Sequence, residues 1–102
     1  MDEFERKVRQ RLKELGPENK VFLKERYEHE LFSKHGLEDQ EINCLFDMKK
    51  LMRVYPDDAF PETRIIGEIN LSKKKKFEVI FMFDPILKGK VLKGKVGIVT
   101  AY

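Results

Sequence analysis

The sequence predicts one α+β domain over residues 1–102, in which N-terminal helices pack on a three- to four-stranded antiparallel meander sheet. Three observations lead to this prediction. Apolar residues recur every three or four positions before residue 49, and they alternate with a period of two after it. A length of 102 residues suits a single hydrophobic core. The hydrophobic share of 41% argues against a largely disordered chain.

Residues 1–16 predict a helix that is added in front of the rest of the domain. Phe4, Val8, Leu12 and Leu15 follow one another at spacings of four, four and three, which places them on one side of a helix. A glycine–proline pair then ends the helix, because glycine suits the C-terminal cap and proline cannot continue the turn. The apolar stripe is narrow, so we expect this helix to lie beside the core.

Residues 20–47 predict a short element followed by two helices. Positions 18–24 fit either the start of a helix or a short edge strand, and the residues do not decide between them. A helix that follows carries Tyr27 on its apolar side and ends at Gly36. Residues 38–47 predict another short helix, with acidic residues in its first turn.

Residues 50–102 predict the antiparallel sheet. The stretch 77–83 is apolar on both faces, which is typical of a central strand. The final strand, 96–102, closes the sheet. We expect the Tyr102 ring to pack on the core, with its hydroxyl at the rim.

Charged residues make up 38% of the chain, and lysine and glutamate dominate this excess, a composition typical of thermophile proteins. Positions 72–95 contain eight lysines, one glutamate and one aspartate, which gives this segment a net charge of +6 (8 − 2). A basic segment of this kind attracts phosphate or an acidic partner. The lysines fall into two groups, at 73–76 and at 88–95, and we expect these groups to lie at opposite ends of the sheet. The candidate nucleic-acid-binding residues are Arg53, Lys73, Lys74, Lys75, Lys88 and Lys90.

Several classes of protein and site are disfavoured. Cys44 is the only cysteine, so no intramolecular disulfide forms and a reducing cytoplasm fits best. The longest apolar run, 79–83, is far shorter than the ~20 residues of a membrane span, and the charged N-terminus does not resemble a secretory signal. The histidines, Cys44 and Asp47 lack the spacing of a metal site. Without a phosphate-binding loop or dinucleotide fingerprint, we expect no cofactor.

The order of several short motifs resembles a known family. The chain is similar to the BrnT-type toxins of type II toxin–antitoxin pairs, which are grouped with the RelE/ParE-like ribonuclease toxins. It is also similar to uncharacterised small proteins that end in a Val-x-Ile-Val-Thr-Ala-Tyr strand. The matching pieces cover about 80 residues: 21–23, Lys34-His35-Gly36, Phe46-Asp47, Tyr55-Pro56-Asp57-Asp58, Arg64-Ile65-Ile66-Gly67, 79–81 and 97–102.

This resemblance implies a metal-independent endoribonuclease that is neutralised by an antitoxin encoded nearby. It assigns the catalytic roles to Lys34, His35 and Arg64. Cleavage of RNA through its own 2′-hydroxyl needs a base, an acid for the leaving group and a cation near the phosphate. The residues themselves allow simpler roles, because cations suit the end of a helix and Arg64 has an acid within reach at Glu68.

Two other functions stay open at this point. The chain could be a binding module that keeps the toxin-like sheet and binds nucleic acid or an acidic protein without cleaving it. It could also pair with another chain through its N-terminal helix or an exposed sheet edge. The sequence does not give the oligomeric state.

Overall fold

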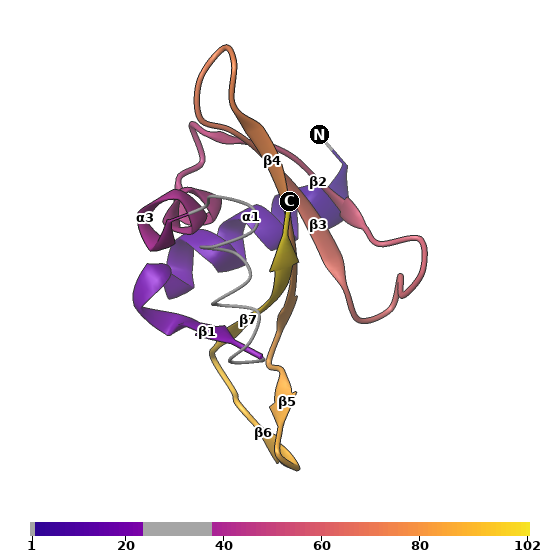
Figure 1. Ribbon diagram of the computed structural model, residues 1–102. Coiled ribbons are helices and arrows are strands. Elements are labelled where there is room, and N and C mark those ends of the chain that lie inside the picture. Colours follow the sequence, from indigo (N-terminus) through magenta and orange to yellow (C-terminus); the bar gives the residue numbers. More distant parts are fainter. Residues whose placement is uncertain (1, 24–37) are drawn as a thin grey trace.

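The structure is a computed structural model, and it describes residues 2–23 and 38–102. A helix packs on a mixed five-stranded sheet with the strand order β1-β7-β4-β3-β2 (Figure 1). The strands of this sheet are β1 (Lys20–Phe22), β2 (Leu51–Pro56), β3 (Ile65–Asn70), β4 (Lys76–Phe83) and β7 (Val96–Ala101). The short strands β5 (Ile86–Leu87) and β6 (Lys90–Val91) form a separate two-stranded ribbon.

The predicted meander forms four of the five strands. β2, β3, β4 and β7 are antiparallel neighbours in that order, and β4 is the central strand, as predicted for residues 77–83. The prediction of a purely antiparallel sheet of three or four strands is wrong, because β1 pairs with β7 in parallel. Positions 20–22 therefore form an edge strand, and three residues are too few to show the period of two that identifies strands in sequence.

The predicted N-terminal helix is present as α1 (Glu3–Leu15). The Asp2 side chain caps it by accepting a hydrogen bond from the Glu5 N–H at 2.7 Å, and Gly16 ends it at φ 71°. A 3₁₀ turn, η1 (Pro17–Asn19), leads into β1. The predicted helix at 38–47 is α3 (Asp39–Ile42) continued by the 3₁₀ helix η2 (Asn43–Phe46). The helix predicted to end at Gly36 lies outside the described residues.

The core lies on the face of the sheet that packs against α1 and η2. Leu12 and Leu45 from these helices are fully buried together with Val79, Phe81 and Ile98 from the sheet. η2 approaches β3 closely at Gly67, where a Cβ would lie 2.9 Å from Cδ1 of Leu45. A larger residue there would push η2 away from the sheet.

Asp84 ties α1 to the loop that precedes β7. Its carboxylate accepts a hydrogen bond from Arg11 Nη2 at 2.5 Å and another from the Gly94 N–H at 2.8 Å. The hydrogen bond from Arg11, followed by that from Gly94, lowers the pKa of Asp84. A carboxyl group with a lowered pKa stabilises the folded state above its unfolded pKa of about 3.9, and this contribution disappears as the pH falls through the folded value.

We therefore expect Asp84→Asn to reduce the free energy of unfolding near pH 7 and to have a smaller effect near pH 3, which lies below the unfolded pKa of about 3.9. The Arg11 and Asp84 side chains are 40% and 35% exposed, so solvent screening limits the ion-pair contribution to about 1 kcal/mol. Urea denaturation at both pH values measures the difference. Asp58→Asn, which changes an exposed aspartate, is the matched control. If Asp84→Asn lowers the free energy of unfolding equally at both pH values, this assignment is contradicted.

Candidate functional site

Two β-bulges turn polar side chains toward the sheet face opposite α1 and η2, which we call the carboxylate face. In β2 the register moves by one residue between Leu51 and Arg53, so Met52 is an extra residue in the strand. A bulge shifts the alternation of side chains by one position. Leu51 and Val54 are therefore buried in the core, whereas Arg53 and Tyr55 lie on the carboxylate face.

The second bulge lies in β7. Ile98 and Thr100 pair with successive residues of β4, which leaves Val99 as the extra residue. Because Ile98 and Ala101 are both buried, Tyr102 lies on the carboxylate face. Its side chain is 55% exposed, so the prediction that its ring packs on the core is wrong.

The hydroxyl of Tyr55 lies between two carboxylates on this face. Glu68 and Glu78 are direct partners across β3 and β4. The Tyr55 hydroxyl is 3.2 Å from Oε1 of Glu68 and 3.3 Å from Oε1 of Glu78. A hydroxyl carries one hydrogen, so it donates to one carboxylate at a time. Like charges directly opposite each other destabilise a sheet, and such local conflicts are typical of functional sites.

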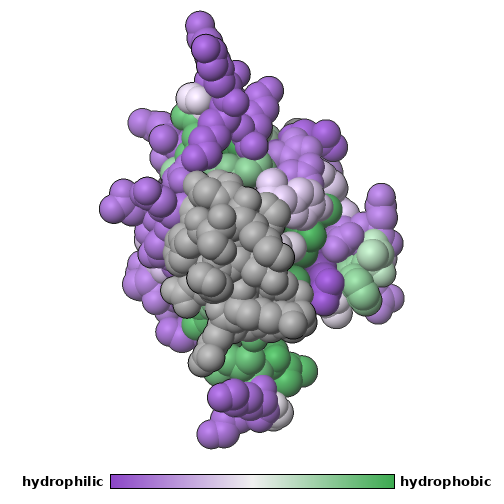
Figure 2. Space-filling view, viewed as in Figure 1, coloured by the Kyte–Doolittle hydropathy of each residue, from purple (hydrophilic) through white to green (hydrophobic). Residues whose placement is uncertain are grey.

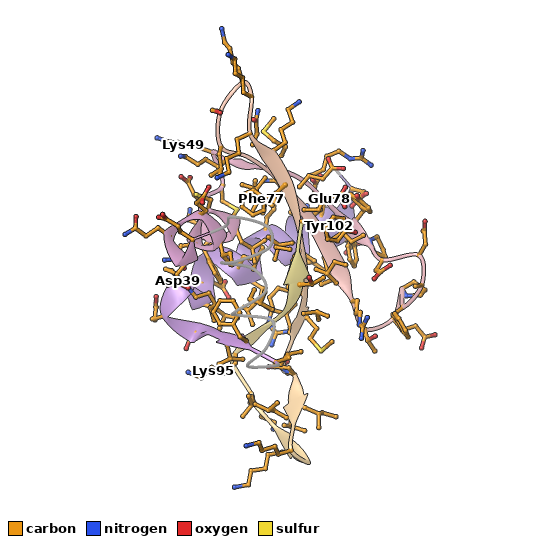
Figure 3. The ribbon with its side chains drawn as sticks, in the orientation of Figure 1. Asp39, Lys49, Phe77, Glu78, Lys95 and Tyr102 are labelled. Carbon is orange, nitrogen blue, oxygen red and sulfur yellow. The ribbon has the colours of Figure 1, made fainter. Side chains whose placement is uncertain are left out.

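Tyr102 lies beside Glu78 in the next strand. The Glu78 N–H donates to the Tyr102 carbonyl at 2.8 Å, and the Tyr102 N–H donates to the Glu78 carbonyl at 3.0 Å. Figure 3 shows Glu78 and Tyr102 on the same side of the sheet, while Phe77 points toward the helices.

Both tyrosine hydroxyls keep their protons at neutral pH. Burial, followed by the negative charge of Glu78 and the hydrogen bond to Glu68, raises the pKa of Tyr55 to about 12. Partial burial, followed by the charge of Glu78, also raises the pKa of Tyr102. Each hydroxyl is therefore available as a proton donor.

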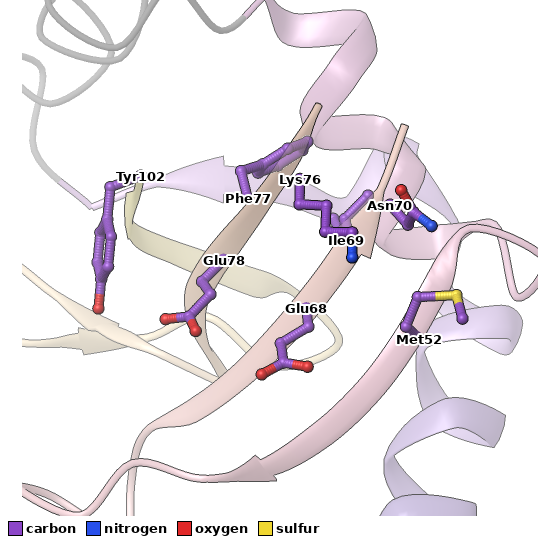
Figure 4. Close-up of a pocket in the computed structure, with 8 residues that line it drawn as sticks. All are labelled: Met52, Glu68, Ile69, Asn70, Lys76, Phe77, Glu78 and Tyr102. Carbon is purple, nitrogen blue, oxygen red and sulfur yellow. The ribbon is translucent and has the colours of Figure 1, made fainter. Parts of the chain in front are cut away.

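A hollow of about 550 Å³ lies beside these groups (Figure 4). Tyr102, Glu78, Glu68, Asn70 and Met52 are among the residues that line it. This volume falls within the range of sites that hold small ligands. The hollow therefore has room for part of a nucleotide chain next to two carboxylates and a tyrosine.

Two cations accompany the two carboxylates. A guanidinium nitrogen of Arg53 lies 3.9 Å from the Glu68 carboxylate, and its guanidinium carbon lies 4.9 Å from the centre of the Tyr55 ring. Lys76 lines the hollow itself. The carboxylate face thus brings together a base, a hydroxyl acid and cations, the three kinds of group that cleavage of RNA through its 2′-hydroxyl requires.

Of the predicted catalytic residues, Arg64 is the one that the structure describes, and it does not line this hollow. Lys34 and His35 lie outside the described residues. Arg64 lines a different hollow of about 480 Å³, where its guanidinium carbon lies 4.2 Å from the centre of the Phe60 ring. The acid within reach of Arg64 in the sequence, Glu68, instead contacts Arg53 and the tyrosine of β2.

The predicted nucleic-acid-binding lysines form two separate groups. Lys73, Lys74 and Lys75 lie in the β3–β4 connection, and Lys88 and Lys90 lie in the β5–β6 ribbon. These segments extend from opposite ends of the molecule, as we expected (Figures 1 and 2). The Nζ of Lys75 lies 2.6 Å from a carboxylate oxygen of α3, so this lysine is tied to the helix.

Glu68 and Glu78 are among the site residues that the sequence did not identify. Each belongs to the polar side of its strand, but the sequence does not show that the two strands place them directly opposite each other. The short lysine-rich connection between β3 and β4 limits the register of this hairpin. Counting outward from the connection would have placed Glu68 opposite Glu78. The tyrosines could not be placed in this way, because the bulges reverse their faces.

Within 2–23 and 38–102, no group of three or more His, Cys, Asp or Glu side chains is placed to hold a metal ion. In the same ranges no helix is long and apolar enough to cross a bilayer. No family model, curated protein or solved structure that was compared with the chain matches it.

Proposed function

We propose that this chain is an RNA-cleaving protein of the toxin-like kind, and that the carboxylate face is its site of cleavage. The observation that carries the proposal is the pair of opposed carboxylates, Glu68 and Glu78, which meet one tyrosine hydroxyl beside a hollow. The ordered motifs that resemble BrnT-type toxins support the same substrate class.

In this proposal the Glu78 carboxylate accepts the proton of a ribose 2′-hydroxyl. The 2′-oxygen forms a bond to the adjacent phosphorus, and the bond from phosphorus to the 5′-oxygen breaks. The 5′-oxygen takes its proton from the Tyr102 hydroxyl, which leaves a 2′,3′-cyclic phosphate and a free 5′-hydroxyl. Arg53 and Lys76 stabilise the charge on the phosphate. Because burial and the charge of Glu78 raise the pKa of Tyr102, the alkaline loss of activity should occur at a higher pH than an ordinary tyrosine would give.

The resemblance supplies further parts of the proposal. It assigns catalytic roles to Lys34, His35 and Arg64, and it names a neighbouring antitoxin as the partner. The lysines at the two ends of the molecule would contact phosphates that flank the cleaved bond.

Expression in bacterial cells tests the proposal. We expect the wild-type chain to slow growth and to fragment cellular RNA, and we expect Tyr102→Phe to remove most of both effects. His35→Ala measures how much the residue implied by the resemblance adds. The exposed Glu14→Gln, on α1, serves as the control that keeps full activity. Normal growth with intact RNA, in cells that contain folded protein, would overturn the proposal.

A non-catalytic nucleic-acid-binding module is the second candidate, and the separation of the lysine groups favours it. Two cationic groups at opposite ends suit contact with two stretches of phosphate. In that case RNA would bind with a Kd of about 10⁻⁴–10⁻⁶ M, and the affinity would fall as the salt concentration rises. The bound RNA would stay intact. Incubation of purified protein with labelled RNA, followed by separation on a gel, distinguishes the two candidates.

A further inference from the structure

The outer edge of β2 is covered by side chains of α1 where a neighbouring strand would otherwise pair. The Val54 N–H donates to Oε1 of Glu5 at 3.1 Å, and Nη2 of Arg9 donates to the Met52 carbonyl at 2.9 Å. One helix side chain thus supplies the acceptor, and another the donor, that an additional strand would supply. An unpaired strand edge otherwise offers a template for another chain.

The next outward position of β2 carries a proline. The Asp57 N–H donates to the Arg64 carbonyl at 3.0 Å, so residue 57 faces the neighbouring strand and Pro56 faces outward. Proline has no N–H, so this position cannot donate to an added strand. At three consecutive outward positions of the edge, one backbone group is therefore either bonded to α1 or missing: the Met52 carbonyl, the Val54 N–H and the absent N–H of Pro56.

The Glu5–Arg9 pair differs from its neighbour on the same helix. The two side chains lie 3.3 Å apart and are only 17% and 15% exposed. Glu3 and Lys7 have the same spacing and a similar distance of 3.2 Å, but they are 69% and 73% exposed. The first pair is held against the strand, whereas the second lies in solvent. Helix stability does not require the first pair to be buried, since exposed pairs at this spacing also stabilise helices.

We propose that Glu5 and Arg9, by bonding to the outer edge of β2, prevent β2 from pairing with the β2 strand of a second copy of this chain. A second copy fits because the uncovered edge is self-complementary. In an antiparallel arrangement centred on Arg53, the Val54 N–H of each copy would meet the Met52 carbonyl of the other. The contact requires the Glu5 and Arg9 side chains to leave the edge of β2, while Leu12 and Arg11 hold the second half of the helix in place.

The test compares two double variants. Glu5→Ala/Arg9→Ala removes the two side chains that bond to the edge of β2. Glu3→Ala/Lys7→Ala removes an exposed ion pair of the same charges and spacing. For the first variant in dilute solution we expect the Val54 amide to exchange its hydrogen about tenfold faster than in the wild type. As the concentration rises, its mass should increase toward two chains of 12.2 kDa and the Val54 amide should become protected again. The second variant should behave as the wild type does.

Glu5→Gln/Arg9→Lys retains an acceptor and a donor, and we expect it to keep wild-type mass and exchange. If the alanine variant does not fold, Arg9→Met carries the test, because it leaves the acceptor for Val54 and removes only the donor to the Met52 carbonyl. A folded alanine variant whose mass and Val54 exchange match the wild type overturns the proposal. An increase in mass without renewed protection of Val54 also overturns it, because association would then use another surface.

Discussion

Replacing Phe81 by alanine is expected to lower the free energy of unfolding by about 3–5 kcal/mol. Phe81 is fully buried on β4, the central strand, and its ring makes an edge contact with Phe83 at a centroid distance of 5.8 Å. A Cβ at Gly67 of β3 would lie 3.3 Å from Cε1 of Phe81, so the ring covers this part of β3 on the core face of the sheet. Alanine would leave a cavity that the surrounding strands cannot close without losing their register.

Urea denaturation followed by circular dichroism measures this loss. The total stability of a domain of this size is typically about 5–15 kcal/mol, so the variant is expected to be near its unfolding threshold at room temperature. Phe60→Ala is the matched control, because Phe60 is 50% exposed and its removal creates no internal cavity. A loss below about 1 kcal/mol for Phe81→Ala would contradict the described core.

Glu78→Gln is expected to reduce the rate of RNA cleavage by about 10²–10⁴ while leaving the protein as stable as the wild type or more so. The amide cannot accept the 2′-hydroxyl proton, so the proposed base is lost. The same change removes the repulsion between two opposed carboxylates, which is worth about 0.2–1 kcal/mol in a sheet. The amide oxygen can still accept the hydrogen bond from Tyr55.

The cleavage rate of purified protein and its urea denaturation curve test both parts of this prediction. Glu14→Gln removes an exposed carboxylate on α1, away from the carboxylate face, and should change neither quantity appreciably. A combined loss of activity and stability would identify Glu78 as a structural residue. Unchanged cleavage would remove it from the proposed site.

Much of the fold could be predicted because its elements carry strong local patterns. Spacings of four, four and three identify α1, and the uninterrupted apolar run 79–83 identifies β4 as central. The parallel strand β1 could not be predicted in the same way. Its three residues are too few for a period, and its pairing with β7 is determined by packing between distant parts of the chain.

The candidate site was only partly predictable, because its two tyrosines depend on bulges. Simple alternation places Tyr102 on the same face as Ile98, whereas the extra residue Val99 moves it to the carboxylate face. Met52 has the same effect on Tyr55. A bulge has no fixed side-chain signature, so these positions follow from the pairing of strands and not from the residues themselves.

The most direct measurement of the central claim is a titration of isotope-labelled protein with a short RNA, made uncleavable by 2′-deoxy substitution and followed by amide chemical shifts. The account predicts that the largest shifts occur at Glu68, Glu78 and Tyr102, on the carboxylate face. Shifts confined to the lysine-rich ends, at Lys73, Lys74, Lys88 and Lys90, would contradict it.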